Sequence, residues 1–339
     1  MVDRSEPLFY DALFRNKKKK GDLCIVEVPV PPLEAPVADS HAHLALLGDP
    51  ALALARCALH GVQFVVAMED VFEDNALDYE MLTAWRAEAE RIIPEVEAAT
   101  RLALAHDGEG VSYRASTCPI AVPHVRIAIG CHPHNAKDYD DALEAQLRER
   151  LRDPRTCAVG EVGLDYHYDF SPRDVQRDVF RRQIRLAHET GLPLILHLRE
   201  AHDEAYELMV EEGFPQAGVL LHCYNLDWET LKPWAERGCY AAFGGPLTFK
   251  KADEVREAAK HLPLNRILTE TDAPYMTPEP MRGMNCGPEH TVFTAACLAE
   301  TLGHTPGADR RELLAAVYGN ARELLDREPT AWQLRNKEA

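Results

Sequence analysis

The feature that most constrains the fold of this chain is a series of short apolar runs that each end on a side chain able to bind a metal. Five such runs are Val37–His43, Ala158–Glu161, Leu194–His197, Gly218–His222 and Ile267–Asp272. In a parallel barrel the carboxyl ends of all strands form one rim, where side chains from distant parts of the chain meet. The pattern therefore predicts a barrel whose rim gathers imidazoles and carboxylates around divalent cations.

The number and spacing of strand candidates predict the fold class. Eight candidates alternate with helix-like segments, and they lie at Val37–His41, Val62–Met68, Val125–Gly130, Cys157–Glu161, Leu194–Leu198, Val219–His222, Tyr240–Phe243 and Ile267–Asp272. Such alternation is typical of α/β proteins, so we predict a (β/α)8 barrel of the TIM type over residues 37–328. The alternative, a doubly wound open sheet, would bind ligands at a switch point instead of at five strand ends.

Three segments are predicted to lie outside this repeat. Residues 1–36 form an amino-terminal arm with a strand at Leu23–Val28, and residues 329–339 form a carboxy-terminal tail. Residues 69–124 form a helical insertion after the second strand, with a kink at Pro94. Because the insertion starts on the rim, two interpretations stay open: a lid or specificity wall, or a helical buttress beside the barrel.

Composition and charge limit the class of partner. The 339 residues are 46% hydrophobic and 27% charged, as in a globular protein, and the net charge of −18 opposes tight, sequence-independent binding to nucleic acid. The only basic run, Lys17–Lys20, is predicted to be a solvated turn. The nine cysteines include no CxxC pair and predict reduced thiols, and no signal or membrane-spanning segment is evident. We expect a cytoplasmic protein with no membrane partner and no obligate protein partner.

The expected metal ligands follow from position and residue type. His41 and His43 lie two apart at a strand end, so strand alternation points both imidazoles the same way toward one ion. Glu161 lies in the middle of the rim, where a carboxylate can give one oxygen to each of two cations. Ligands at three other strand ends complete the expected set, namely His197, His222 and Asp272.

Other polar side chains near the rim are candidates for substrate contacts. Arg199 lies on the same side of its strand as His197, which suits a metal beside a phosphate or carboxylate. His132 and His134 follow the third strand in a rigid turn, and they either contact substrate or bound water or support the structure. For Asp165 an ordinary turn role and support of the ligands both stay open.

These motifs resemble the TatD family of metal-dependent hydrolases and DNases, within the amidohydrolase-like barrels. The resemblance covers Asp39–Leu44, Gly130–His134, Gly160–Tyr166, His197–Arg199, His222–Tyr224, Gly244–Lys250 and Glu270–Tyr275. It implies a TIM-type barrel and two divalent ions, of which Zn, Mg, Mn and Ni are all candidates. It also implies that one ion is held by His41, His43, Glu161 and Asp272, and the second by Glu161, His197 and His222.

The chain departs from the usual family pattern in three places. The amino-terminal arm and the insertion at 69–124 exceed the usual family chain, so access to the site is expected to differ. Family members often carry Arg-Gly-x-x-Asn-Glu-Pro after the last strand, whereas this chain reads Arg-Gly-Met-Asn-Cys-Gly-Pro over residues 282–288. Only Arg282 of this segment is carried over, as a substrate-binding residue.

The resemblance predicts a divalent-metal-dependent phosphodiesterase, specifically a deoxyribonuclease of the 3′–5′ exonuclease type. Glu161 and Asp272 are the expected catalytic residues, Glu161 by joining two metals that activate a water and Asp272 by orienting that water and accepting its proton. The phosphate would be held by Arg199, Arg282, His132 and His134. The expected substrate is DNA or a small phosphoester.

Two other functions are compatible with the same residues. An amidohydrolase acting on a small amide, ester or lactone would use the same activated water against a carbonyl. Many such barrels join their metals through a modified Lys on the fourth strand, but this chain has Glu161 there and no Lys, which favours phosphoester chemistry. The other alternative is a metal-binding scaffold without activity.

Overall fold

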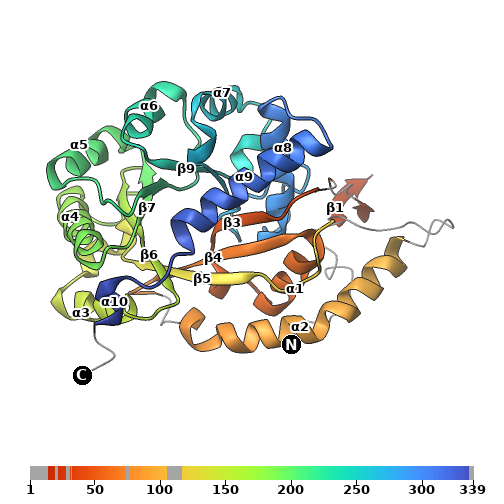
Figure 1. Cartoon of the computed structure of the whole chain (residues 1–339), viewed down its shortest axis with the longest axis horizontal. Helices are drawn as coiled ribbons and strands as arrows, with labels where there is room; N and C mark the ends of the chain where they lie inside the picture. Colours follow the sequence, from red (N-terminus) through yellow and green to blue (C-terminus); the bar gives the residue numbers. More distant parts are fainter. Residues whose placement is uncertain are drawn as a thin grey trace.

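The computed structural model describes residues 14–19, 22–27, 31, 33–73, 77–104 and 117–335 of the chain. Of residues 14–19, 22–27 and 99–104 only the backbone is described. Eight parallel strands form one sheet in sequence order, from β3 to β10 (Figure 1). Their bounds are β3 Val37–Ala42, β4 Val62–Asp70, β5 His124–Gly130, β6 Thr156–Asp165, β7 Leu194–Arg199, β8 Val219–Leu221, β9 Tyr240–Phe243 and β10 Ile267–Thr269.

The sheet closes into a barrel through contacts between its first and last strands. Just beyond β10, the Asp272 N–H donates to the His41 carbonyl at 2.9 Å, and the His43 N–H donates to the Ala273 carbonyl at 2.8 Å. A parallel bridge joins Ala42 to Ala273. The predicted (β/α)8 barrel is therefore confirmed, and its closure places the carboxyl ends of β3 and β10 side by side.

Six of the eight strands end at residues other than those predicted; β3, β4 and β7 run one or two residues further, and the differences in β6, β8 and β10 affect the expected ligands. Strand β6 continues to Asp165 instead of ending at Glu161, and its register against β7 shifts between Val159 and Val162. Such bulges re-aim side chains, and Glu161 lies inside this one. Strands β8 and β10 end earlier than predicted, so His222 and Asp272 follow their strands instead of lying within them.

Helices surround the barrel and cover its outer face (Figure 1). Their bounds are α1 Pro50–His60, α2 Leu77–Leu104, α3 Asp141–Arg150, α4 Arg173–Thr190, α5 His202–Glu212, α6 Trp228–Glu236, α7 Asp253–His261, α8 Thr291–Thr301, α9 Ala308–Leu325 and α10 Ala331–Leu334. Helix α1 shows how local chemistry fixes their ends: the Asp49 carboxylate accepts from the Leu52 N–H at 3.0 Å, and Gly61 ends the helix at φ 80°.

The barrel interior is filled by a separate set of apolar side chains. They alternate along the strands with side chains that face the helices. The inner set comprises Ala38, Phe64, Val66, Met68, Ala128, Ala158, Ile195, Leu220, Ala242 and Leu268. Ala321, Leu324 and Leu325 of α9 pack against the same set, so α9 crosses and covers the amino-terminal end of the barrel (Figure 1). Polar side chains line the carboxyl end of the barrel.

The predicted insertion forms the covering helix α2, which lies alongside α1 (Figure 1). Its buried face carries the expected apolar side chains, including Leu82, Ile92 and Val96. The Tyr79 hydroxyl lies 2.7 Å from the Thr156 hydroxyl at the start of β6. Helix α2 therefore has the character of the buttress, and it continues through the proline at which a kink was predicted. Residues 105–116 lie outside the described part.

The amino-terminal arm contains a two-stranded antiparallel sheet, β1 Phe14–Lys19 and β2 Asp22–Glu27. The predicted strand at Leu23–Val28 corresponds to β2, although Val28 itself lies outside the described residues. The prediction that Lys17–Lys20 form a turn is wrong for Lys17 to Lys19, because these residues pair with β2 as part of β1. Lys20 is not among the described residues. None of the described helices is both long and apolar enough to cross a bilayer.

Candidate metal centre

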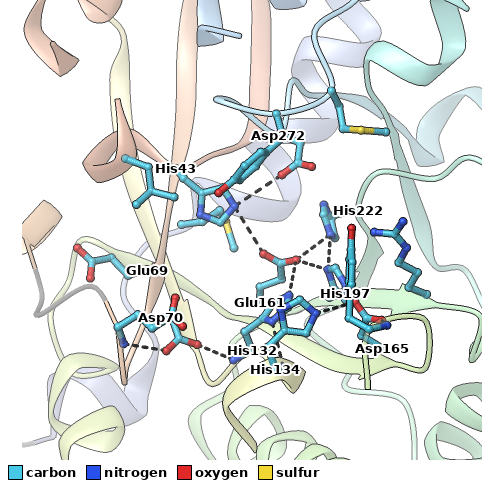
Figure 2. A pocket seen from close by; sticks show the side chains of 17 residues that line it. His43, Glu69, Asp70, His132, His134, Glu161, Asp165, His197, His222 and Asp272 are labelled. Atoms are coloured by element: carbon cyan, nitrogen blue, oxygen red, sulfur yellow. Dashed lines mark hydrogen bonds and ion pairs between the residues drawn. The ribbon is translucent and has the colours of Figure 1, made fainter. Parts of the chain in front are cut away.

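The predicted ligands surround a cavity of about 380 Å³ at the carboxyl end of the barrel (Figure 2). The side chains that line it include His43, His132, His134, Glu161, Asp165, His197, Arg199, His222 and Asp272. His41 is fully buried and reaches Glu161 from β3. All six predicted metal ligands therefore lie in one place, although they are separated by more than 200 residues along the chain.

A first group of ligand atoms has the spacing of a metal site. The Glu161 Oε2 atom lies 3.2 Å from His41 Nε2 and 3.8 Å from His43 Nε2. The Asp272 Oδ1 atom lies 3.8 and 3.6 Å from the same two nitrogens. Ligands about 2.1 Å from a tetrahedral cation are separated from one another by roughly 3.4 Å. The four side chains therefore fit one cation.

A second group uses the other oxygen of the same carboxylate. Glu161 Oε1 lies 2.5 Å from His197 Nδ1 and 2.9 Å from His222 Nε2, and these two nitrogens are 3.2 Å apart. His41, His43 and Glu161 of the first group are close enough together to share a cation, and so are all three members of the second. Glu161 thus presents one oxygen to each group, which is the arrangement of a carboxylate that joins two metals.

Unpartnered nitrogens support the assignment of a metal to this site. Among the described residues, neither ring nitrogen of the buried His41 has a hydrogen-bond partner. The neighbouring His222 ring presents Nε2 to Glu161 and Nδ1 to Glu270. The two rings are stacked, with centroids 3.9 Å apart. Buried polar atoms are almost always paired, so nitrogens left over beside carboxylates fit a site built for cations. Imidazole and carboxylate are suitable ligands for Zn, Mn, Ni and, through the oxygens, Mg.

The charges of the site favour an ionised Glu161 between imidazoles. Burial raises the pKa of Glu161, but His222, His41 and His197 outweigh it and lower the pKa well below its usual value. Burial, reinforced by the neighbouring His222, lowers the pKa of His41 to about 4. His41 is therefore neutral at pH 7 and able to donate a lone pair to a metal.

Two buried carboxylates that the sequence reasoning did not select hold the ligands in place. The Asp39 side chain accepts from the backbone N–H groups of His41 at 3.2 Å and of Thr271 at 2.9 Å, which ties β3 to the segment after β10. Glu270 accepts from the Cys223 N–H at 2.5 Å and lies 3.6 Å from His222 Nδ1. Both precede predicted ligands by two residues, and this spacing was the signal that could have identified them.

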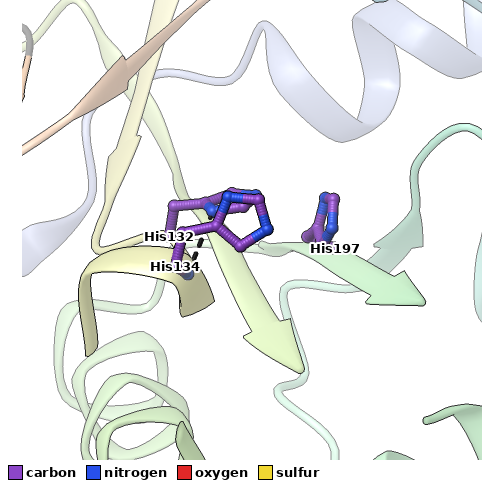
Figure 3. Close-up of side chains that lie close together, drawn as sticks. All are labelled: His132, His134 and His197. Atoms are coloured by element: carbon purple, nitrogen blue, oxygen red, sulfur yellow. Dashed lines mark hydrogen bonds between the residues drawn. The ribbon is translucent and has the colours of Figure 1, made fainter. Parts of the chain in front are cut away.

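His132 and His134 lie beside the second group and are connected to it (Figure 3). His132 Nδ1 accepts from the His134 N–H at 3.2 Å, and His132 Nε2 lies 3.6 Å from Glu161 Oε1. His134 Nε2 is 2.8 Å from Asp165 Oδ2, and the same oxygen is 3.3 Å from His197 Nε2. The three imidazoles could themselves surround a cation, but His197 already belongs to the second group.

Asp165 combines the two roles that the sequence left open. Its Oδ2 atom is within hydrogen-bond distance of the His134 and His197 rings. Its Oδ1 atom accepts from the backbone N–H groups of His167 and Tyr168, each at 3.0 Å. It therefore orients a ligand and caps a turn at once. A contact role for His132 and His134 toward substrate stays a prediction, because their positions are also explained by this network.

The two predicted arginines lie in different places. Arg199 lines the cavity, with its guanidinium 4.6 Å from the centre of the Tyr168 ring. Arg282 does not line this cavity; its guanidinium lies 3.9 Å from the ring centre of Phe249, in a neighbouring pocket. The two pockets share only Met276. The opposite wall of the cavity includes Glu69, Asp70 and Glu73, none of which was selected from the sequence as a site residue. All three belong to the predicted insertion at 69–124, so its first residues form a wall of the site while α2 packs beside the barrel.

Comparisons with known proteins agree with this geometry. The Bacillus subtilis protein YabD, described as an uncharacterized metal-dependent hydrolase, is 40% identical over 51% of this chain and 68% of its own length. The human 3'-5' RNA nuclease TATDN2 is 37% identical over 48% of this chain but only 22% of its own length. Among solved structures, the TatD homologue YjjV from Escherichia coli superposes with a TM-score of 0.66 at 25% identity, covering 86% of this chain and 98% of that one.

The family relationship extends over nearly the whole barrel. The family described as TatD related DNase matches residues 38–326, a range that runs from the start of β3 to the end of α9 and contains each predicted ligand. The chain therefore belongs to the TatD-related DNase family, and it is a metal-dependent hydrolase.

Proposed function

We propose that this protein is a phosphodiesterase that removes nucleotides from the 3′ end of a single-stranded nucleic acid, DNA being the expected substrate. The observation that carries the proposal is the position of Glu161, whose two oxygens face two separate groups of metal ligands. Two metals about one carboxylate are typical of sites that stabilise both the attacking and the leaving oxygen of a phosphodiester. When bound, the cations supply an acidified water and positive charge for the phosphoryl oxygens.

Asp272 is the proposed proton acceptor. It lines the cavity, and its Oδ1 atom lies 3.6 Å from His43 Nε2. Burial raises the pKa of Asp272, but a hydrogen bond from His43 and the charges of His222 and His41 outweigh it and lower the pKa. Asp272 is therefore an ionised carboxylate at neutral pH, and it can orient an attacking water and take up its proton.

Arg199 is the proposed phosphate clamp. It lines the cavity and follows the ligand His197 by two residues on β7. Its guanidinium can donate to a phosphoryl oxygen next to the metals and so offset charge that develops there. Carboxylates of Glu69, Asp70 and Glu73 line the opposite wall, so a polynucleotide is expected to enter from the side of Arg199.

The relatives support phosphoester chemistry more than amide chemistry. TATDN2, which is 37% identical over 48% of this chain, is a 3'-5' RNA nuclease. Organophosphorus hydrolases and a lactonase-derived enzyme share the architecture, but at 16% identity they support the fold alone. RNA must therefore be assayed beside DNA.

The test is cleavage of 3′-labelled and 5′-labelled single-stranded DNA and RNA by protein loaded in turn with Zn, Mg, Mn and Ni. The proposal predicts that a 3′ label is released as mononucleotide at once, whereas a 5′-labelled strand shortens stepwise. Glu161→Gln should lose this activity, and Glu200→Gln, an exposed glutamate paired with His167, should keep it. Turnover of an amide, ester or lactone panel with no cleavage of either nucleic acid would contradict the proposal.

A further inference from the structure

Two aromatic side chains next to the site are exposed to an unusual degree. Tyr168 and Phe170 follow β6, and they retain 47% and 56% of their accessible surface. Their rings are stacked, with centroids 5.4 Å apart and planes 20° apart. Exposed large apolar groups that lie together on one loop are a common feature of binding surfaces. We refer to Tyr168 and Phe170 as the aromatic pair.

The loop that carries the aromatic pair is held at both ends. At its start, Asp165 accepts from the Tyr168 N–H at 3.0 Å. At its end, the buried Ser171 donates its hydroxyl to the His134 carbonyl at 2.7 Å and accepts from the Lys137 N–H at 3.0 Å. The rings are therefore presented by a fixed backbone, which reduces the entropy lost when a ligand packs on them.

The aromatic pair is continuous with the metal centre. Tyr168 lines the same cavity as Glu161, whereas Phe170 lies beyond its lining. The His134 ring meets both aromatic rings edge-on, at centroid distances of 5.5 and 4.8 Å. The Arg199 guanidinium lies 4.6 Å from the Tyr168 ring centre. If Arg199 binds the phosphate of a nucleotide, the base of that nucleotide can therefore reach the aromatic pair.

We propose that the aromatic pair is a stacking platform for a nucleobase of the single-stranded substrate, next to the phosphodiester that is cleaved. This inference rests on the proposed function. Base stacking on aromatic side chains tolerates any sequence, because every base has a π face. It also explains how a chain with net charge −18 holds a polyanion: the binding is local, through one guanidinium and stacked rings instead of a broad basic surface.

The first experiment measures binding without turnover. The metal-loaded protein is titrated into a fluorescent single-stranded oligonucleotide with phosphorothioate linkages, which are hydrolysed slowly, and into the same backbone with abasic residues at the 3′ end. The intact oligonucleotide should bind about tenfold more tightly than the abasic one. Tyr168→Ala and Phe170→Ala should each reduce this ratio, and the double substitution should abolish it.

Matched variants separate stacking from damage to the fold. Tyr168→Phe keeps an aromatic ring and should retain the preference for the intact oligonucleotide. Trp332→Ala removes a ring that also packs on an arginine, Arg152 at 4.6 Å, but on α10 outside the cavity, and it should behave like the unsubstituted protein. Equal affinity for both oligonucleotides in the unsubstituted protein, or an unchanged ratio in the double variant, would overturn the inference.

Steady-state kinetics distinguishes this inference from the proposed function. Loss of the platform should raise KM for an oligonucleotide about tenfold with little change in kcat, because stacking binds ground state and transition state alike. Cleavage that is indifferent to the terminal base would contradict the platform while leaving the nuclease in place. Tight base-dependent binding with no cleavage would contradict the nuclease and leave the platform.

Discussion

The two ends of the barrel both contain buried polar or ionisable side chains, but the ends differ in how fully the protein supplies hydrogen-bond partners for these side chains. At the amino-terminal end, Arg126 donates to the Asp326 carboxylate and to three backbone carbonyls, and Gln333 donates to three more. At the carboxyl end, His41 has no hydrogen-bond partner among the described residues, although Glu161 lies 3.2 Å away. At the amino-terminal end these polar side chains have their partners within the protein, whereas at the carboxyl end His41 needs a cation as its partner.

This difference suggests that the amino-terminal end mainly stabilises the fold and that the carboxyl end mainly serves the reaction. A buried group with all its hydrogen bonds made stabilises the fold, whereas a crowded set of carboxylates and imidazoles costs stability until a ligand compensates it. Such a cost at the carboxyl end of a barrel is expected of an active site. Substitutions at the two ends should therefore have separable effects on turnover and on the free energy of unfolding.

The largest effect is expected from Glu161→Gln. Removing the charge that both ligand groups share should lower kcat/KM for a nucleic acid by about 10³-fold or more. The metal-free variant should lose some free energy of unfolding, because the lowered pKa of Glu161 means that the neighbouring imidazoles favour its charge, but this loss should be small beside the loss of turnover. Initial rates and denaturant unfolding of the metal-free protein measure the two effects. A metal-free variant that is much less stable would show that Glu161 mainly supports the fold.

The opposite result is expected from Arg126→Met at the amino-terminal end. Breaking this buried network should lower the free energy of unfolding by about 3 kcal/mol. Turnover per folded molecule should stay within about twofold, because the site lies at the far end of the strands. Urea unfolding and kcat on the same preparation test this. Arg335→Met, an exposed arginine on the same end, is the control and should change neither quantity.

A smaller effect is expected from Glu270→Gln. Glu270 lies 3.6 Å from His222 Nδ1 and orients that ring of the second ligand group. The variant should bind the second metal about tenfold more weakly and the first almost normally. Competition titration with a chromophoric chelator resolves the two affinities. Glu254→Gln, at an exposed position in α7, should leave both unchanged, and equal weakening of both sites would contradict the assigned role.

The smallest effect is the release of a proton when metal binds. Burial lowers the pKa of His222, but Glu161 and Glu270 outweigh it and raise the pKa well above its usual value, so His222 is protonated at pH 7 without metal. Its Nε2 must lose that proton to bind a cation, so affinity should rise with pH up to the raised pKa. Calorimetry in buffers of different ionisation enthalpy should detect about one released proton. A buffer-independent enthalpy would contradict this.

The sequence predicted those features that depend on local pattern. Short apolar runs located all eight barrel strands, although not all of their ends. The positions of His41, Glu161 and Asp272 at strand ends were enough to expect their convergence, because a parallel barrel has only one rim for such residues. The family resemblance reached the same set.

The remaining features depend on contacts between distant segments. The bulge that carries Glu161 arises from its pairing with β7, and β6 is longer than its apolar run suggests. Spacing can single out Asp39, but its partner, the Thr271 N–H after β10, is a contact between the two ends of the sheet that spacing does not identify. Amphipathic spacing in α2 could not distinguish a lid from a buttress, since both bury one face. Nor could the sequence place Tyr168 beside Arg199.

The measurement that tests the central claim most directly is anomalous diffraction from crystals grown with Mn or Zn. The account predicts two peaks on either side of Glu161, one among His41, His43 and Asp272 and the other between His197 and His222. A single ion, or ions only among His132, His134 and His197, would contradict it.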